Sequence, residues 1–158
     1  MFVRIKKIAG HEYGYLVENT WTEKGSRQQT KAYLGRIIPL AVEKEMHHDI
    51  AQGDFADAIL ELAKNTLLSC GFNNKYRKGT WHFNPTTLET FNKNKPAVFK
   101  IKDGFFCKPT LERLLQFDGK GKEEEVGLRL AKEVVAAGLL VDNTTFVQLF
   151  KKVFRRKD

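Results

Sequence analysis

The stretch with the most potential for chemistry is YGYLVENTWTEKGSRQQTKAYLGR, residues 13–36. Aromatic and β-branched residues form a run at each end, and the polar residues between them surround Gly25, a residue type that takes positive φ without steric cost. Two extended runs joined in this way predict a β-hairpin. Because alternate residues of a strand share a face, we expect one face of the second strand to carry Arg27, Gln29, Lys31 and Tyr33.

This predicted face suits contact with nucleic acid. A two-stranded ribbon can enter a major groove, where Arg and Lys match guanine, Gln matches adenine, and any cation can hold phosphate. The same residue types also occur on ordinary solvated sheet faces. Both interpretations stay open at this point.

Three short motifs in the same region carry a family resemblance: YLVE at 15–18, KGSRQ at 24–28 and YLGR at 33–36. They resemble the N-terminal segment of transposases of the IS1634/IS4-like group, in which a short sheet with LVE, GK-hydrophobic-RQ and LGR motifs precedes the catalytic domain. The resemblance covers residues 1–40 and implies DNA engagement through Arg27, Gln29, Lys31 and Arg36. The family's larger RNase H-like domain with three spaced carboxylates has no counterpart here, so transposition itself is not implied.

Composition favours a polyanionic partner. The 158 residues include 27 Lys and Arg against 19 Asp and Glu, a net charge of +8. Nucleic acid, an anionic membrane surface and an acidic protein all satisfy this charge. No apolar run is long enough for a membrane span, and the first residues lack the apolar core of a signal peptide, so we expect a cytoplasmic protein.

Cations are concentrated in three regions. The first region is a three-stranded meander, formed by the hairpin and a predicted strand at residues 2–8. The candidate nucleic-acid contacts of this meander are Arg4, Lys6, Lys24, Arg27, Gln29, Lys31, Tyr33 and Arg36. A loop-like segment offers Lys75, Tyr76, Arg77 and Lys78, with Tyr76 available to stack on a base, although the segment could equally be a linker. The last predicted helix ends with Lys152, Arg155 and Arg156, which would also stabilise a helix C-terminus without any ligand.

Catalytic and metal-binding signals are weak. Glu43 and His47 have the i, i+4 spacing of many metal pairs, with Asp49 nearby, but HEXXH is absent and no third ligand is identified. Cys70 and Cys107 form no CxxC motif, and we interpret both as buried apolar residues. We therefore expect no metal, no cofactor and no enzymatic activity.

The remaining pattern predicts an α+β fold. Helices are expected over 54–70, 84–91, 110–117, 122–137 and 144–156, a short helix or turn over 42–50, and a hairpin over 97–108 turning at Asp103-Gly104. The expected architecture is an N-terminal three-stranded antiparallel sheet, a central helix, a second small β-hairpin sheet and a helical C-terminus. We expect a β module over 1–38 and an α+β body over 39–158, with a candidate internal boundary at 73–79.

These patterns lead to a small, basic, non-catalytic nucleic-acid-binding protein. DNA ranks slightly ahead of structured RNA, including ribosomal RNA, because of the family resemblance. The alternative is an adaptor that docks an acidic protein through its basic face and the Phe-rich C-terminal helix. The first hypothesis requires that cations distant in the sequence come together on one surface.

Overall fold

The computed structural model describes residues 1–45, 49–50 and 52–154, and these residues form eight strands and four helices. The strands are β1 (Phe2–Ile8), β2 (His11–Thr22), β3 (Gly25–Leu40), β4 (Arg77–Lys78), β5 (Trp81–Phe83), β6 (Thr90–Asn92), β7 (Lys95–Ile101) and β8 (Gly104–Phe106). The helices are α1 (Phe55–Ser69), α2 (Lys108–Leu115), α3 (Glu123–Ala136) and α4 (Asn143–Phe154). The α+β class predicted from the sequence is confirmed.

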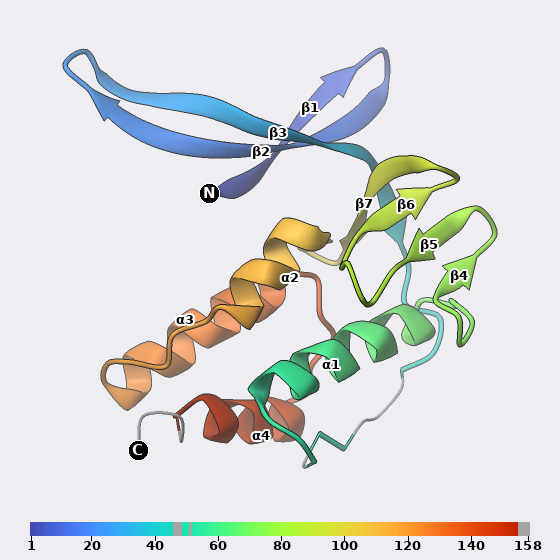
Figure 1. The fold of residues 1–158 in the computed structure, drawn as a ribbon, viewed down its shortest axis with the longest axis vertical. Coiled ribbons are helices and arrows are strands. Elements are labelled where there is room, and N and C mark those ends of the chain that lie inside the picture. Colours follow the sequence, from blue (N-terminus) through green and yellow to red (C-terminus); the bar gives the residue numbers. More distant parts are fainter. Residues whose placement is uncertain (46–48, 51, 155–158) are drawn as a thin grey trace.

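All eight strands belong to one sheet, in the order β1-β2-β3-β7-β6-β5-β4, with β8 paired to β7 (Figure 1). The pairs are antiparallel except β3–β7, in which residues 36–40 run parallel to residues 97–101. The prediction of two separate sheets is therefore wrong, because β3 belongs to both parts. The boundary proposed after residue 38 falls inside this strand.

Pro39 directly follows the predicted β module over 1–38 but lies within β3. It pairs with Lys100 of β7, whereas the pairing of β3 with β2 begins at Arg36 and extends toward the turn. At Pro39, β3 therefore has a neighbouring strand on one side only. A proline is tolerated at such a position, because no strand on the open side needs the N–H that proline lacks.

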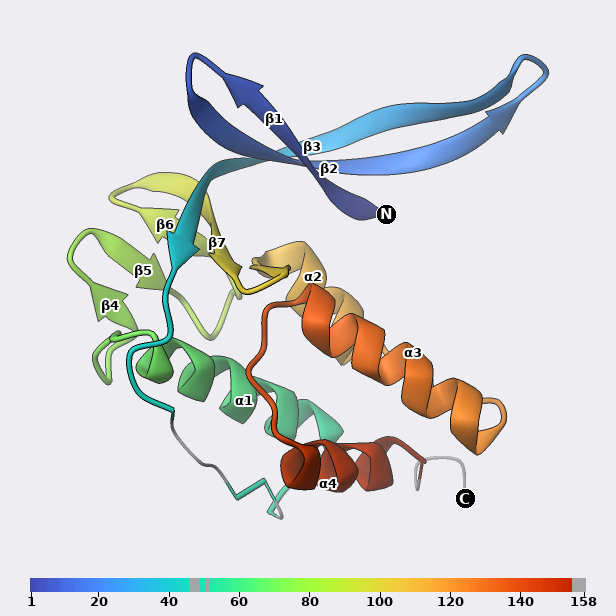
Figure 2. The ribbon, with the colours of Figure 1, turned by 180° about the vertical axis from the view of Figure 1, so that it is seen from behind.

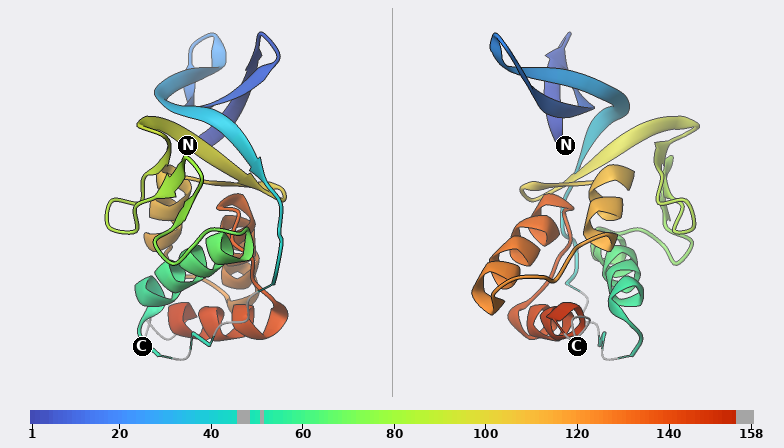
Figure 3. Two further views of the ribbon diagram at one scale, coloured as in Figure 1. Left: turned by 90° about the vertical axis from the view of Figure 1, so that its right-hand side faces the viewer. Right: turned by 60° about the vertical axis from the view of Figure 1, so that its left-hand side comes forward.

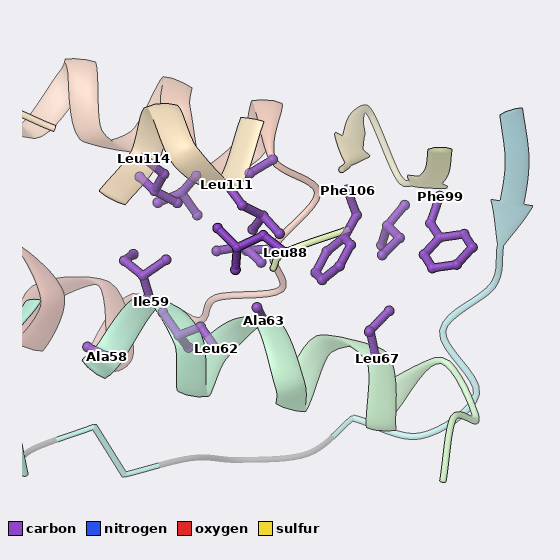
Figure 4. Close-up of a cluster of buried hydrophobic side chains, with 14 of the residues drawn as sticks. Ala58, Ile59, Leu62, Ala63, Leu67, Leu88, Phe99, Phe106, Leu111 and Leu114 are labelled. Atoms are coloured by element: carbon purple, nitrogen blue, oxygen red, sulfur yellow. The ribbon is translucent and has the colours of Figure 1, made fainter. Parts of the chain in front are cut away.

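The main core lies between α1 and the sheet. Asp54 caps α1, accepting a hydrogen bond from the Asp57 amide at 2.9 Å, as its position before an apolar-periodic run predicts. The apolar side of α1 points toward aromatic residues of β7 and β8 and toward leucines of α2 (Figure 4). The members of the main core include Ile59, Leu62, Leu67, Phe99, Phe106, Leu111 and Leu114.

The helices α1, α2, α3 and α4 confirm four of the predicted helices with small shifts at their ends. The helix predicted over 84–91 is wrong: the Asn84 side chain accepts from the Thr86 amide at 2.9 Å, and Leu88 has φ of +67°. Phe83 already pairs with Thr90, so the chain must reverse within six residues and no helix fits. Residues 42–45 and 49–50 are not helical either, and residues 46–48 of that predicted segment lie outside the described chain.

The β7–β8 hairpin is confirmed with its turn shifted by one residue. Ile101 pairs with Gly104, so the two-residue loop is Lys102-Asp103, and Lys102 adopts φ of +53°. Gly104 is needed for another reason: a Cβ there would lie 1.9 Å from the carbonyl oxygen of Val135. The glycine lets the end of α3 approach the sheet backbone.

A second, smaller core lies under the N-terminal strands. Ile37, Val98 and Cys107 are buried there, on the opposite side of β3 and β7 from Ile38 and Phe99, which face the main core. The apolar residues that cover it are Val3, Ile5, Leu34 and Phe105. The strands β1, β2 and the first part of β3 thus fold over the body with one face inward, and the tip of the β2–β3 hairpin projects beyond it (Figures 2 and 3).

A groove of about 620 Å³ separates these strands from α2 and α3. Arg113 of α2 bridges it, donating a hydrogen bond to the Met1 carbonyl at 2.5 Å while pairing with Glu133 at 3.0 Å. The N-terminal strands are therefore fastened to the body at a second point besides β3.

Gly35 is expected to be essential for the junction of β3 with β7. It has φ of +111°, and a Cβ would lie 2.1 Å from the carbonyl oxygen of Pro96. Gly35→Ala should lower the free energy of unfolding by about 3 kcal/mol, because it adds a backbone clash to a disfavoured φ. The control is Gly25→Ala, where φ is +104° but nothing lies within 4 Å of the Cβ. Denaturant unfolding measures the free energy of unfolding of each variant. An equal decrease in Gly35→Ala and Gly25→Ala would contradict the proposed clash.

Stability is expected to fall in alkali because of Cys70. Burial raises the pKa of this thiol from 9.0 to about 11, and the side chain is 0% exposed. The folded protein then holds the proton more tightly than the unfolded chain, so the free energy of unfolding should decrease as pH rises from about 9 to about 11. Denaturant titrations should show a shallower decrease in Cys70→Ala than in the wild type; parallel curves would refute the assignment.

Candidate nucleic-acid interface

The register between β2 and β3 decides which side chains share a face. Tyr15 pairs with Tyr33 and Leu16 with Ala32, but Val17 pairs with Thr30, so Lys31 is an extra residue at a bulge. A bulge of this kind reverses the alternation beyond it. Tyr33 therefore lies on the opposite face from Arg27 and Gln29, and the prediction that all four residues share one face is wrong.

We call the side that carries Tyr13 and Tyr15 the outer face of the N-terminal strands. Cross-strand pairing places Lys6 and Arg36 opposite Tyr13, and Arg4 and Tyr33 opposite Tyr15. The outer face faces away from the second core, because Val3, Ile5 and Leu34 cover that core from the inner face. Its polar and aromatic residues are Arg4, Lys6, Tyr13, Tyr15, Trp21, Gln28, Tyr33 and Arg36.

Three tyrosine rings cluster on the outer face. The Tyr33 ring lies 5.3 Å from that of Tyr15 and 6.4 Å from that of Tyr13, measured between centroids, with interplanar angles of 54° and 39°. Tyr33 is 51% exposed. Burial raises the pKa of Tyr33 above its ordinary value, and the neighbouring Tyr15 and Tyr13 hydroxyls raise it further. Tyr33 therefore presents a neutral aromatic ring at physiological pH.

Cations surround this cluster without carboxylate partners. Lys6 Nζ lies 4.6 Å from the centroid of Tyr15, Arg36 Nη2 donates to His11 Nδ1 at 2.8 Å, and Arg4 donates to Gln28 Oε1. Within the described residues, none of these three cations forms an ion pair with an acidic side chain. The outer face is thus positive and free of local neutralisation.

The acidic residues of the strands lie elsewhere. Glu12 pairs with Lys7 across β1 and β2, and both alternate with outer-face residues, so they occupy the inner face. Glu18 is also on the inner face, and Glu23 lies in the turn. The outer face of the three strands therefore carries cations, aromatic rings and amides but no carboxylate.

The side chains of Arg4 on β1 and Gln28 on β3 form a hydrogen bond across the middle strand, β2. They lie opposite Tyr15 and Asn19 respectively, so their hydrogen bond passes over Val17. Val17 is 1% exposed although it lies on the outer face. The bond thus covers an apolar side chain and holds the Arg4 guanidinium near the tyrosines.

The inner face of the hairpin carries three of the four residues for which the transposase resemblance implies DNA contact, Arg27, Gln29 and Lys31, whereas Arg36 lies on the outer face. Lys31 Nζ pairs with Glu18 at 3.4 Å and donates to Gln29 Oε1 at 3.3 Å. Arg27 is exposed on the same side, and Lys24 is exposed in the turn. The inner face is thus partly neutralised, with Lys31 held by a carboxylate.

The distal part of the β2–β3 hairpin is exposed on both faces. Residues 26–33 of β3 are all exposed, and Trp21, paired with Ser26 near the tip, is 86% exposed. Trp21 falls on the outer face because it alternates in step with Tyr13 and Tyr15. This ribbon has no core of its own.

The second basic region is only partly available for binding. Tyr76 packs against the main core, with its ring 6.3 Å from that of Phe83. Lys78 is held by Glu43 at 3.0 Å and by the Cys70 carbonyl at 2.9 Å. Lys75 and Arg77 are exposed.

The third basic region lies at the other end of the molecule. Lys152 belongs to α4, which is remote from β1–β3 in every view (Figures 1, 2 and 3), and it donates to the Gly53 carbonyl at 2.7 Å. Arg155 and Arg156 lie outside the described residues. Phe146 and Phe150 of the same helix pack against the main core. The described parts of the three basic regions therefore do not come together on one surface. The requirement stated above is met only within the first region, where Arg4 and Lys6 of β1 share a face with Arg36 of β3.

The candidate metal residues do not form a site in the described chain. Glu43 is paired with Lys78, and His47 lies outside the described residues. Among residues 1–45, 49–50 and 52–154, no group of three His, Cys, Asp or Glu side chains is arranged to hold a metal ion.

No protein-family model matches the chain, and neither a curated protein nor a solved structure is significantly similar to it. The transposase resemblance thus stays a prediction from the N-terminal motifs. No helix of the described chain combines the length and apolar character that a membrane span requires.

Of the residues that share the outer face, Arg4, Lys6, Tyr33 and Arg36 were predicted from the sequence as candidate contacts, whereas Tyr13, Tyr15 and Trp21 were not. The signal for the missed residues was present, because positions 13, 15 and 21 differ by even numbers and lie on one face of a single strand. The bulge that brings Tyr33 to the same side has no comparable local signal.

The tyrosine cluster predicts a measurable coupling. Tyr15→Phe should lower the pKa of Tyr33 toward its ordinary value of 10.0, but only in part, because burial is the larger cause and remains. An NMR titration of ring-labelled tyrosine checks this. Tyr76→Phe, remote from the cluster, should leave the pKa of Tyr33 unchanged; an unchanged pKa in Tyr15→Phe as well would show that the rings are not coupled.

Proposed function

We propose that this protein is a non-catalytic nucleic-acid-binding protein that contacts its target through the outer face of β1–β3. The single observation that carries the proposal is the segregation of charge described above. Arg4, Lys6 and Arg36 share a face with three tyrosines, and that face has no carboxylate. Polyanionic phosphate is the chemistry that such a face attracts.

The amide and aromatic groups favour nucleic acid over other polyanions. Gln28 lies between the cations and the hairpin tip, and an amide can both donate to and accept from a base edge. Aromatic rings offer stacking surfaces that an acidic protein or a membrane headgroup would not use in the same way. Cations, amides and rings on one surface match the components of a nucleotide.

The shape of the hairpin supports the same proposal. An isolated two-stranded ribbon is marginally stable in water, yet the distal β2–β3 segment exposes both faces. A ribbon of this width fits a major groove, so a duplex could supply the surface that the protein lacks there. The transposase resemblance makes DNA the first target to test and structured RNA the second.

The test is a salt titration of binding to duplex DNA and to a folded RNA. The variant Arg4→Gln/Lys6→Gln/Arg36→Gln should reduce the slope of log affinity against log salt by about 3 for duplex DNA, because roughly one counterion is released per phosphate contact. Affinity at low salt should fall correspondingly.

The matched control is Lys44→Gln/Lys120→Gln/Lys151→Gln, which removes the same charge from exposed positions outside the N-terminal strands. It should change the slope little. Binding that is absent at low salt, or that is insensitive to salt, would end the proposal. An equal reduction in both triple variants would show that net charge, and not the outer face, is responsible.

A further inference from the structure

The tyrosine cluster lies where the N-terminal sheet is three strands wide. Tyr13 on β2 is flanked by Lys6 on β1 and by Arg36 on β3. Neighbouring strands are about 4.8 Å apart, so three backbones alone span about 10 Å. With side chains added, this part of the sheet is too wide for a B-DNA major groove of about 12 Å. Only the distal two-stranded ribbon has the width for a groove.

The rings nevertheless present the type of surface that bases use. In a duplex the flat faces of the bases are covered by their neighbours, whereas in a single strand those faces are free to stack on protein aromatics. Tyr33 is half exposed and lies in contact distance of Tyr15. An unpaired base can stack there without the disruption of base pairs.

Phosphate sites flank the rings on both sides. Lys6 reaches over the Tyr15 ring from β1, and Arg36 lies beside Tyr13 on β3. Arg4 and Gln28, already linked to each other, add a donor and an amide beside Tyr15 and Asn19. This arrangement suits a single nucleic-acid strand. Its bases could stack on the rings while the cations on both sides bind its phosphates.

We propose that the outer face binds single-stranded nucleic acid, with an unpaired base stacked on the exposed ring of Tyr33 and phosphates held by Lys6 and Arg36. This inference rests on the proposed function and specifies its ligand. DNA and RNA strands share the required chemistry, so the experiment includes both.

Trp21 extends the same face toward the hairpin tip. It is six residues from Tyr15 along β2, which corresponds to about 20 Å of extended strand. A strand long enough to reach from the tyrosines to Trp21 gains a second stacking site. Binding is therefore expected to strengthen with length until both sites are covered.

The experiment measures fluorescence anisotropy of the full chain with single strands of about 10 nucleotides, a length within the usual site sizes. The probes are oligodeoxyuridine, oligouridine and a DNA duplex stem of equal length closed by a non-nucleotide linker, all at one salt concentration. At least one single strand should bind roughly 10-fold more tightly than the stem.

Substitutions at Tyr33 identify the stacking contact. Tyr33→Phe keeps the ring and should retain single-strand affinity, whereas Tyr33→Leu keeps apolar bulk and should lose roughly 10-fold. The two variants should bind the duplex stem with equal affinity. Circular dichroism melting confirms that each variant is folded, which is expected because the position is half exposed.

The outcomes separate this inference from the function on which it rests. Equal affinity for strand and stem, or no loss in Tyr33→Leu, would overturn the single-strand assignment, while salt-dependent binding would still support the proposed function. No binding to any probe at low salt would overturn both. A preference between oligodeoxyuridine and oligouridine would show whether the 2′-hydroxyl is recognised, because the two strands carry the same base.

Discussion

The parallel pairing of β3 with β7 is the constraint on which the rest of the structure depends. It requires Gly35, because the β3 backbone approaches the Pro96 carbonyl too closely for any side chain. It also divides the interior: Ile38 and Phe99 point to the main core, and Ile37 and Val98 point to the smaller one. A single strand thereby belongs to the packed body at one end and to the exposed hairpin at the other. The N-terminal strands are consequently joined to the body through the sheet itself.

The bulges in β3 have the largest effect on the candidate site. Without the extra residue at Lys31, Tyr33 would face the same way as Gln29 and the tyrosine cluster could not form. Glu12 and Glu18 occupy the inner face because both alternate with the outer-face residues of β2, and Glu18 pairs there with Lys31. The bulge in β3 therefore adds Tyr33 to the face that carries no strand acid. Bulges commonly redirect side chains in this way next to functional sites.

Local signals in the sequence were sufficient for much of the fold. Asp54 before an apolar-periodic run located α1, and the β-rich runs around Gly25 located the long hairpin. The joining of two predicted sheets was not accessible, because a parallel pair between residues 36–40 and 97–101 depends on contacts some sixty residues apart. The helix predicted over 84–91 was also wrong, because an Asn at this position can either cap a helix or form an Asx turn. The pairing of Phe83 with Thr90 leaves room only for the turn.

The exposed ribbon illustrates how function and stability are linked here. The distal β2–β3 segment buries almost no side chain, so its hydrogen-bonded ladder depends on continuity with the inner strands that cover the second core. Segments with few buried contacts lie at the low-stability end of a fold, from which binding elements are usually drawn. A polyanion laid on the outer face would neutralise Arg4, Lys6 and Arg36 and cover the tyrosines. In the proposed complex the ligand would supply contacts that the chain itself leaves unmade, whereas without a ligand the ribbon depends on the inner strands alone.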